Sequence, residues 1–415
     1  MKKYSSIQIE GSYHDLISKI EPNEFSLLKR DEQNFLLGWD LKEKLTIDND
    51  YANFLSVDQF ISDNAGDYLF GLISYDLKNS IYPVLSSQNI SHLNEEQSTF
   101  STYNNIIVCN EGDFLYFGLE DKVPEVTSLF KAGLNTKDNR FELEITPLEN
   151  QTAYLLKIEK LKHLIQRGDI YEVNYCTAFH LLKENLNPNA TFQNIQEKTQ
   201  APFGAFLRNS HFDILSGSPE RFLKKIDNKL YSQPIKGTAK RSDDKGEDER
   251  LVKQLKSSKK DHAENVMIVD LVRNDLSKIA SKNSVAVDEL SQLYSFKSVH
   301  QLISTVSCKI DKVEFSEILK ATFPMGSMTG APKLNAMKFA ENHEEFKRGY
   351  YSGAIGVIEP NGNFDFNVII RTLIFDRATK NSKIGVGGAI TILSNDEEEY
   401  EECFIKLKAI KESVC

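Results

Sequence analysis

Two pairs of acidic residues at helical spacing are the first feature of this sequence that could do chemistry. Asp261 and Glu264 precede a run of apolar residues with the period of a helix, and both project toward its apolar side. Glu399 and Glu402 stand three residues apart on a second predicted helix, with Lys406 four residues further on. Two helices that each offer two carboxylates could hold one hard cation such as Mg²⁺, which prefers carboxylate, water and substrate oxygens.

Each acidic pair also has an interpretation without a metal. Asp261 and Glu264 fall in the first turn of their predicted helix, where acids cap free N–H groups and complement the helix dipole. For Glu399 and Glu402, a solvated acidic face with a Glu–Lys pair to Lys406 is the simpler interpretation when that helix is taken alone. Both interpretations stay open at this point.

Two glycine-rich segments and one arginine are further candidates for binding. Phe323–Lys333 lacks the Gly-Lys-Ser/Thr of a phosphate loop, although its backbone could face an anion. Gly385–Ala389 lacks the βαβ context of a dinucleotide site, and glycines in a strand usually mark close approach of backbone or ligand. Arg371 ends an apolar strand run, which fits either a buried salt bridge or a clamp for a carboxylate.

The elements that must position these residues are a mixture of strands and helices. Short strands are predicted at 68–75, 105–109, 114–119 and 384–393, hairpins at 212–234 and 351–376, and helices from Thr152 to Gly168 and over 396–413. Residues 1–120 form an N-terminal region, 121–151 a linker or excursion, and 152–415 the region that carries the candidate residues. Without strict βαβ alternation, this order predicts an α+β fold.

Composition excludes several classes of function. The chain has 415 residues and a net charge of −10, which argues against nucleic-acid and anionic-membrane partners. Its five scattered cysteines form no C-x-x-C pair, so neither a disulfide framework nor a zinc site is expected. No apolar run follows the first lysines or is long enough to span a bilayer, and we therefore expect a soluble, cytoplasmic protein.

Taken together, these segments resemble the chorismate-binding family, which includes anthranilate, aminodeoxychorismate, isochorismate and salicylate synthases. The matching strings occur in family order over roughly residues 150–410: 168–174, 218–222, 234–238, 263–275, 323–333, 348–353, 370–372, 385–390 and 399–403. The N-terminal third matches more loosely, mainly at Phe70–Leu77.

The resemblance implies a fold and a set of binding residues. The fold is like that of anthranilate synthase component I: two large packed antiparallel β-sheets with helices outside and the first third interwoven with the rest. Asp261, Glu264, Glu399 and Glu402 match positions that hold Mg²⁺ directly or through water. The positions that hold the two carboxylates of chorismate are matched by Thr238, Tyr351, Arg371, Gly387, Ala389 and Lys406.

Lys236 implies the aminodeoxychorismate synthase branch, because anthranilate synthases have alanine there. In that branch the lysine attacks ring carbon 2 as the 4-hydroxyl departs, ammonia adds at carbon 4, and the lysine leaves. Such a lysine must be neutral, so its reference pKa of about 10.4 would have to be lowered. Glu220 matches the general acid that protonates the leaving hydroxyl, a function that needs a raised pKa. Without the surrounding motif, Lys236 would pass for a surface lysine in a turn.

Two departures from the family pattern bear on the reaction. Gln301 stands where the family has a histidine, which disfavours anthranilate formation, and Glu172 stands where glutamine is common and could pair with Lys236 or tune its proton. The chain shows no glutaminase motif, so ammonia is expected from a separate glutamine amidotransferase subunit, in the pathway to p-aminobenzoate and folate. The alternatives are anthranilate synthase component I and a subunit that binds chorismate or an amidotransferase without catalysis.

Overall fold

The strands of the protein form one continuous antiparallel network. The computed structural model describes residues 3–414 except 8–12, 21–23, 32, 49–50, 88, 94, 96, 130–144, 183–185 and 298. In this part of the chain, 20 strands are joined by hydrogen bonds. The first stretch of the network contains β14 (Ala286–Ser295), β15 (Val299–Lys309), β13 (Ile235–Lys240), β12 (Lys229–Gln233), β11 (Arg221–Ile226), β18 (Phe364–Val368) and β17 (Ala354–Ile358).

N-terminal strands lie in the middle of the network. They are β1 (Lys3–Ile7), β2 (Phe25–Asp31), β3 (Asn34–Ile47), β4 (Leu69–Ile73), β5 (Ser98–Asn110) and β6 (Asp113–Phe117). β4 pairs with β17 on one side, and β2 pairs with β9 (Phe203–Arg208) on the other. The network continues through β10 (Phe212–Ser218), β19 (Thr372–Asp376), β20 (Asn381–Ile390) and β8 (Glu172–Leu182), with short β7 (Ile145–Pro147) and β16 (Gly330–Ala331) beside β8. The first third of the chain is thus interwoven with the rest, and the boundaries near 120 and 152 stay a prediction.

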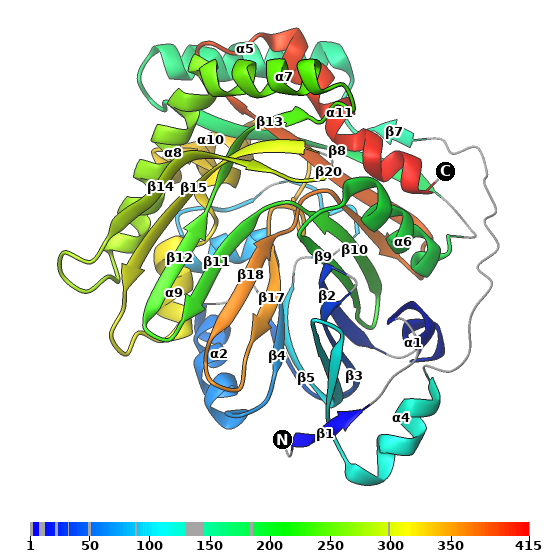
Figure 1. Cartoon of the computed structure of the whole chain (residues 1–415). Helices are drawn as coiled ribbons and strands as arrows, with labels where there is room; N and C mark the ends of the chain where they lie inside the picture. Colours follow the sequence, from blue (N-terminus) through cyan, green and yellow to red (C-terminus); the bar gives the residue numbers. More distant parts are fainter. Residues whose placement is uncertain are drawn as a thin grey trace.

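Helices surround the strands (Figure 1). The α-helices are α1 (Tyr13–Ile20), α2 (Tyr51–Asp63), α3 (Lys78–Ile81), α4 (Val123–Leu129), α5 (Gln151–Gln166), α6 (Pro188–Thr199), α7 (Lys245–Ser257), α8 (Lys259–Ser277), α9 (Phe315–Thr322), α10 (Lys333–His343) and α11 (Asp396–Val414), and single 3₁₀ turns are η1 (Tyr75–Leu77), η2 (Glu120–Lys122) and η3 (Gly326–Met328). The predicted α+β class is confirmed. Of the helices in the described residues, none has the length and apolar character that crossing a membrane requires.

Most predicted elements are confirmed, and the two hairpins are shorter than expected. β11 and β12 turn at Asp227, and β17 and β18 turn near Gly362, whose φ of 78° suits a tight turn. Residues 212–218 and 372–376 instead form β10 and β19, which pair with each other. Sequence alone could not predict that these two strands pair, because a tight turn indicates only that the residues on its two sides pair with each other.

Buried apolar side chains form two large clusters on the described part of the chain. One contains Phe315 and Ile355, and the other contains Tyr154, Ile384 and Leu407. The second cluster holds β8 and β20 against α5 and α11. Helices α8 and α11 are therefore fixed on the strands that carry the candidate residues.

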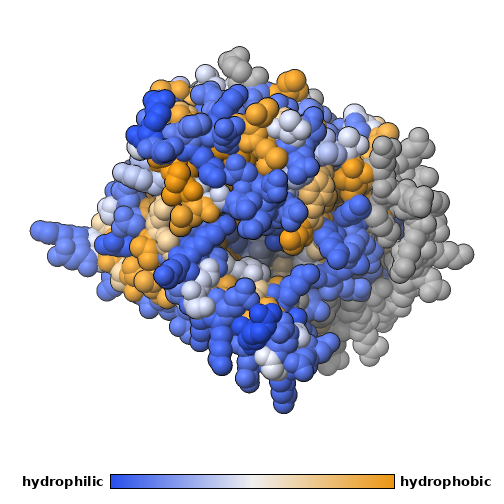
Figure 2. Space-filling model, turned by 90° about the horizontal axis from the view of Figure 1, so that it is seen from above, coloured by the Kyte–Doolittle hydropathy of each residue, from blue (hydrophilic) through white to orange (hydrophobic). Residues whose placement is uncertain are grey.

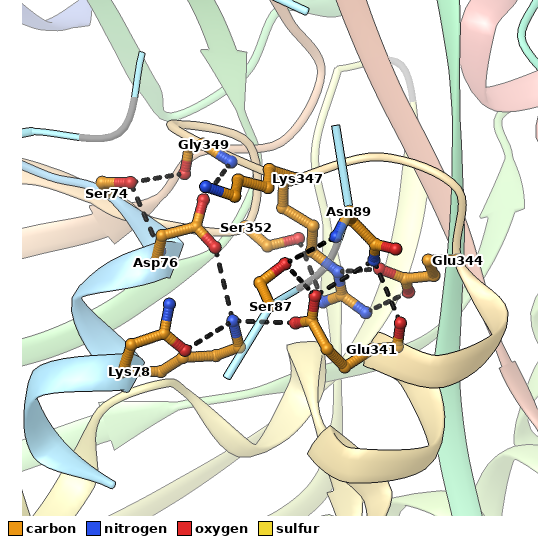
Figure 3. A network of polar contacts seen from close by, with 12 residues as sticks. Ser74, Asp76, Lys78, Ser87, Asn89, Glu341, Glu344, Lys347, Gly349 and Ser352 are labelled. Carbon is orange, nitrogen blue, oxygen red and sulfur yellow. Dashed lines mark hydrogen bonds and ion pairs between the residues drawn. The ribbon is translucent and has the colours of Figure 1, made fainter. Parts of the chain in front are cut away.

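A buried polar network fixes the chain beneath the segment 348–351 (Figure 3). The guanidinium of Arg348 donates to both carboxylate oxygens of Glu344, at 2.9 and 2.5 Å, and to the carbonyl oxygens of Met328 and Asn174, at 2.7 and 2.8 Å. Lys78 is fully buried and lies 3.0 Å from Glu341. Charges buried this deeply require partners, and here each has one.

Candidate active site

Lys236 points into the protein because β13 carries a bulge. In the pairing with β15, Ile235 lies opposite Ile303 and Thr238 opposite Gln301, so two residues face one in between. Gly237 in the bulge has a φ of 90°, which glycine adopts without strain. The extra residue changes the direction in which the side chains of this strand point, and Lys236 is only 9% exposed. The alternative interpretation, a surface lysine in a turn, is therefore wrong.

Acidic side chains surround the Lys236 amine. Its Nζ lies 3.0 Å from Oε1 of Glu172 and 3.8 Å from Oε2 of Glu264. Burial lowers the pKa of Lys236, but the charges of Glu172, Glu264 and Glu220 outweigh burial and raise that pKa above its usual value. The lowered pKa that the sequence led us to expect is wrong for this arrangement, because an ammonium paired with carboxylates is favoured.

Glu220 lies between β10 and β11 with its carboxyl group buried. Burial raises the pKa of this group to about 7, while the hydroxyl of Ser327 and the charges of Lys236 and Lys406 act in the opposite direction. A carboxyl group with this pKa is protonated in a substantial fraction of molecules at neutral pH and can donate a proton. This property fits the general-acid function expected of Glu220.

The first pair of predicted metal ligands lies on α8. Ser258, not an acid, caps this helix, since its side chain accepts a hydrogen bond from the N–H of Asp261. Glu264 is buried on the inner face, and burial raises the pKa of its carboxyl group to about 7. Asp261 lies close to the bulge, because a Cβ added to Gly237 would meet the Asp261 carboxyl carbon at 3.0 Å. Ser258 therefore provides the cap, Asp261 remains in the first turn, where its charge complements the helix dipole, and Glu264 lies beyond that turn.

The second pair, on α11, is bonded to lysines. Glu399 is buried and accepts a hydrogen bond of 2.9 Å from Lys260. Glu402 lies 2.7 Å from Nζ of Lys406, which also donates to the carbonyl oxygen of Gly387 at 2.6 Å. The solvated acidic face proposed from the sequence is wrong for Glu399, because α11 packs that side chain onto β20.

The predicted metal ligands converge without forming a closed site. As placed, no three His, Cys, Asp or Glu side chains of the described residues are close enough together to hold one ion. The donor set nevertheless fits Mg²⁺, because all four side chains offer carboxylate oxygens. Oε1 of Glu264 is buried and has no hydrogen-bond partner among the described residues, which is the condition of an atom that awaits a cation or a donor. A Cβ on Gly388 would lie 3.0 Å from Oε2 of Glu399, so glycine leaves room beside this carboxylate.

Residues expected to bind the substrate carboxylates lie next to the acids. The guanidinium of Arg371 is 3.5 Å from the carbonyl oxygen of Lys406, and the Arg371 backbone has a φ of 52°, a strained conformation for arginine. Tyr351 is buried against β20, where a side chain on Gly385 would collide with its ring. A Cβ on Gly387 would meet the Cys176 sulfur at 2.6 Å, so this position also requires glycine.

The remaining predicted residues lie at the edges of this arrangement. The Gln301 amide is buried on β15 and donates to the hydroxyl of Thr238 at 3.4 Å. Ala389 lies on β20 opposite Asn174 of β8, and its carbonyl oxygen accepts a hydrogen bond from Ser394. Strands β13, β8 and β20 and helices α8 and α11 thus bring together side chains that are far apart in the sequence.

Three polar residues at the site were missed by the sequence analysis. Asn265 donates to the carbonyl oxygen of Lys236 at 2.9 Å and thereby fixes the bulge. Ser327 lies beside Glu220, and Lys260 binds Glu399. A signal existed for Lys260, since a lysine in the first turn of a helix opposes the helix dipole and calls for an explanation.

A cavity of about 540 Å³ lies elsewhere, between residues of β2, β3, β9, β11 and β18, and none of the predicted site residues lines it. On the face of the molecule seen from above, hydrophilic residues predominate and apolar ones form separate groups (Figure 2). Neither feature competes with the acid and lysine cluster as the candidate site.

Comparison with curated proteins gives several relatives with one name. The chain is 33% identical to aminodeoxychorismate synthase, chloroplastic, of Arabidopsis thaliana over 94% of this chain and 44% of the relative. It is 39% identical to aminodeoxychorismate synthase component 1 of Escherichia coli over 61% of this chain and 56% of the relative. These relatives are longer proteins, and the chain covers about half of their length.

Solved structures and a family model agree on the fold. Anthranilate synthase component I from Streptococcus pneumoniae superposes with a TM-score of 0.77 at 22% identity, covering 99% of this chain and 95% of the other. The menaquinone-specific isochorismate synthase MenF of Escherichia coli gives a TM-score of 0.80 at 16% identity, covering 100% and 94%. The anthranilate synthase component I-like fold is thereby confirmed. The model of the chorismate binding enzymes matches residues 23–412, and the chain belongs to this family.

Proposed function

We propose that this protein aminates chorismate to 4-amino-4-deoxychorismate, as an aminodeoxychorismate synthase component I. The observation that carries the proposal is the buried amine of Lys236, which lies 3.0 Å from Glu172 and close enough to the partly protonated Glu220 for their charges to interact. A largely buried amine, beside one group that can accept a proton and another that can donate one, fits nucleophilic substitution. The names of the curated relatives support the same reaction.

The proposed reaction assigns one task to each of three residues. Lys236 passes a proton to Glu172 across their hydrogen bond and attacks carbon 2 of the ring with the freed amine. Glu220 donates its proton to the 4-hydroxyl, which leaves as water while the ring double bond shifts. Ammonia then adds at carbon 4 and gives one proton to the Glu220 carboxylate. The ring double bonds shift back, the bond between carbon 2 and Lys236 breaks with its electron pair going to the lysine nitrogen, and the amine takes its proton back from Glu172. The first step moves a proton over a single hydrogen bond within a buried site, which suits general acid–base catalysis.

Mg²⁺ fits the acidic residues as the cofactor. Glu264 and Glu399 are buried with oxygens that face the site, and Asp261 and Glu402 flank them, so these four would hold the ion directly or through water. Bound there, Mg²⁺ would neutralise the ring carboxylate and draw electrons from the ring. Arg371 and Lys406 supply positive charge for the second carboxylate, and Tyr351, Thr238 and the backbone at Gly387 and Ala389 would complete the binding of chorismate.

The proposal extends to the source of ammonia and the pathway. We propose that a separate glutamine amidotransferase subunit supplies ammonia, in keeping with the "component 1" name of the bacterial relative. The product would enter the synthesis of p-aminobenzoate and folate in the cytoplasm. Product analysis with chorismate, Mg²⁺ and ammonium tests this, because anthranilate with released pyruvate would instead identify an anthranilate synthase.

Trapping the covalent intermediate tests the chemistry most directly. The protein is incubated with chorismate and Mg²⁺ without ammonia, digested, and analysed by mass spectrometry. We expect an adduct on the peptide with Lys236, lost in Lys236→Met and retained in Lys240→Met, which alters an exposed lysine of the same strand. Circular dichroism checks that both variants fold. Turnover by Lys236→Met at the wild-type rate would refute the proposal, and chorismate binding without adduct or product would indicate a non-catalytic subunit.

A further inference from the structure

Lys260 places a positive charge among the acids that we assign to the metal. Its Nζ lies 2.9 Å from Oε1 of Glu399, and the charges of Glu264 and Glu402 also act on it. The ammonium therefore faces three of the four proposed ligands. Of the described residues, only Glu399 forms an ion pair with Lys260.

The position of Lys260 opposes the local helix dipole. It occupies the first turn of α8, whose N-terminal end carries partial positive charge and favours acids. A lysine there interacts unfavourably with the helix dipole, and a specific contact is needed to offset this cost. The contact with Glu399 joins α8 to α11 across 139 residues of sequence and supplies this offset.

The two partners differ in their freedom to move. The Lys260 side chain is 43% exposed, whereas that of Glu399 is 3% exposed. A lysine has a flexible four-carbon stem and a strongly hydrated ammonium, so Lys260 can swing into water at small cost. Glu399 is fixed by the packing of α11 and cannot follow it. Breaking the pair would leave Glu399 in place with an oxygen free for another cation.

The charges around the acids are also nearly balanced by lysines. Glu264, Glu399 and Glu402 are each within 4.0 Å of one lysine, namely Lys236, Lys260 and Lys406. Lys236 and Lys406 have further partners in Glu172 and the Gly387 carbonyl. Lys260 has the most exposed side chain of the three, at 43% against 10% for Lys236 and 24% for Lys406.

We propose that the Lys260 ammonium and a divalent cation compete for the Glu399 carboxylate, so that the metal must displace Lys260 in order to bind. The inference rests on the proposed metal site and assigns to Lys260 the function of setting its affinity. Lys260 is thus a positioning residue for Glu399. Its ammonium neutralises the buried Glu399 carboxylate while no metal is bound, and this contact lowers the affinity of the site for the divalent cation.

Binding of Mn²⁺ measured by electron paramagnetic resonance, without chorismate, tests the competition apart from activity. Lys260→Met is expected to bind Mn²⁺ about two- to fivefold more tightly than the wild type, the range that a partly exposed ion pair contributes. Lys260→Arg keeps the charge and should stay close to the wild type. The neighbour Lys259 is exposed and forms no ion pair with the residues that the structure describes, so Lys259→Met removes a charge from the same turn and is the matched control. Mg²⁺ should displace the Mn²⁺ in each protein.

The outcomes separate this inference from the proposed function. Equal or weaker Mn²⁺ binding by Lys260→Met, with normal circular dichroism, would overturn the competition and leave the metal site standing. An equal gain in Mn²⁺ affinity in Lys259→Met would also overturn the competition, because the gain would then come from removing any nearby positive charge. If no variant and no wild-type protein binds Mn²⁺, the metal site itself fails and the competition with it. If Lys260→Met does not fold, Lys260→Gln replaces it with the same expected gain.

Discussion

The amine of Lys236 and the carboxylate of Glu172 form a buried ion pair, with 3.0 Å between Nζ and Oε1. Within the part of the chain that the structure describes, Oε2 of Glu172 has no hydrogen-bond partner, so the hydrogen bond of this carboxylate goes to the amine. The pair comes from strands β13 and β8, which do not pair with each other. The departure from the family's glutamine at position 172 therefore has a direct consequence for the protonation of the proposed nucleophile.

Glu172→Gln should make Lys236 more reactive toward cyanate, which modifies neutral amines. Removing the nearest negative charge lowers the pKa of Lys236, since Glu172 is the largest of the charges that raise it. A carboxylate at this distance shifts a pKa by about 1–3 units, so at pH 8 carbamylation of Lys236 should be about tenfold faster or more. Mass spectrometry compares Lys236 with exposed Lys240 in the same sample. An unchanged ratio between the two lysines would show that Glu172 does not hold the proton on Lys236.

Glu220→Gln should reduce turnover by about 10²–10⁴-fold with little change in chorismate binding, because it removes the proposed proton donor. The pKa of Glu220 is raised to about 7, so its carboxyl group should lose its proton between pH 6 and 8. Infrared spectra should show the carboxylic-acid band fading over this range in the wild type and fading less in the variant. The exposed Glu401→Gln is the control. Identical spectral changes in wild type and Glu220→Gln would contradict the assignment.

The buried Glu220 should also make stability depend on pH. Its pKa is about 7 in the folded protein and near 4.5 without the fold, so the folded state holds the extra proton between these values. Stability is therefore fully retained below pH 4.5 and falls as pH rises toward 7, by up to about 3 kcal/mol. Urea unfolding at pH 5 and pH 8 should show a smaller difference for Glu220→Gln than for the wild type. A larger difference in the variant would mean that Glu220 is ionised in the folded protein.

The sequence predicts the type of the site better than its geometry. Helical period alone places Glu264 on the apolar side of α8, where the structure buries it. The direction of Lys236 depends on a bulge, which exists only in the register between β13 and β15 and has no local signature except Gly237. Lys260 and Glu399 meet because two helices pack together, so neither residue's neighbours in sequence indicate the contact. The pattern of residues within one strand or helix cannot predict contacts that depend on strand register or on the packing of two helices.

Gly388→Ala should weaken catalysis while the fold persists. The added Cβ would lie 3.0 Å from Oε2 of Glu399, so this side chain must shift by a few tenths of an ångström, whereas Nζ of Lys406 at 3.9 Å stays in ordinary contact. Displacement of groups that position a substrate costs about tenfold to 10²-fold in kcat/KM. Gly246→Ala on α7, where a Cβ meets only Asp244 at 3.3 Å, is the control. A Gly388→Ala protein with wild-type kcat/KM would remove Glu399 from the site.

Arg348→Met should destabilise the whole fold, because the arginine is the only cation beside Glu344 among the described residues. Its loss would leave the buried Glu344 carboxylate without its paired cation, although the N–H of Cys176 still donates to it, and would remove the donor to the carbonyl oxygens of Met328 and Asn174. Removing one partner of a buried pair costs about 3–5 kcal/mol, to be measured by urea unfolding. The double variant with Glu344→Gln should lose less than the sum of the two single losses, since the stranded charge is then absent. Additive losses would show that Arg348 acts through its contacts with backbone carbonyl oxygens alone. Arg348→Lys should not restore stability, because only the planar guanidinium reaches all three acceptors.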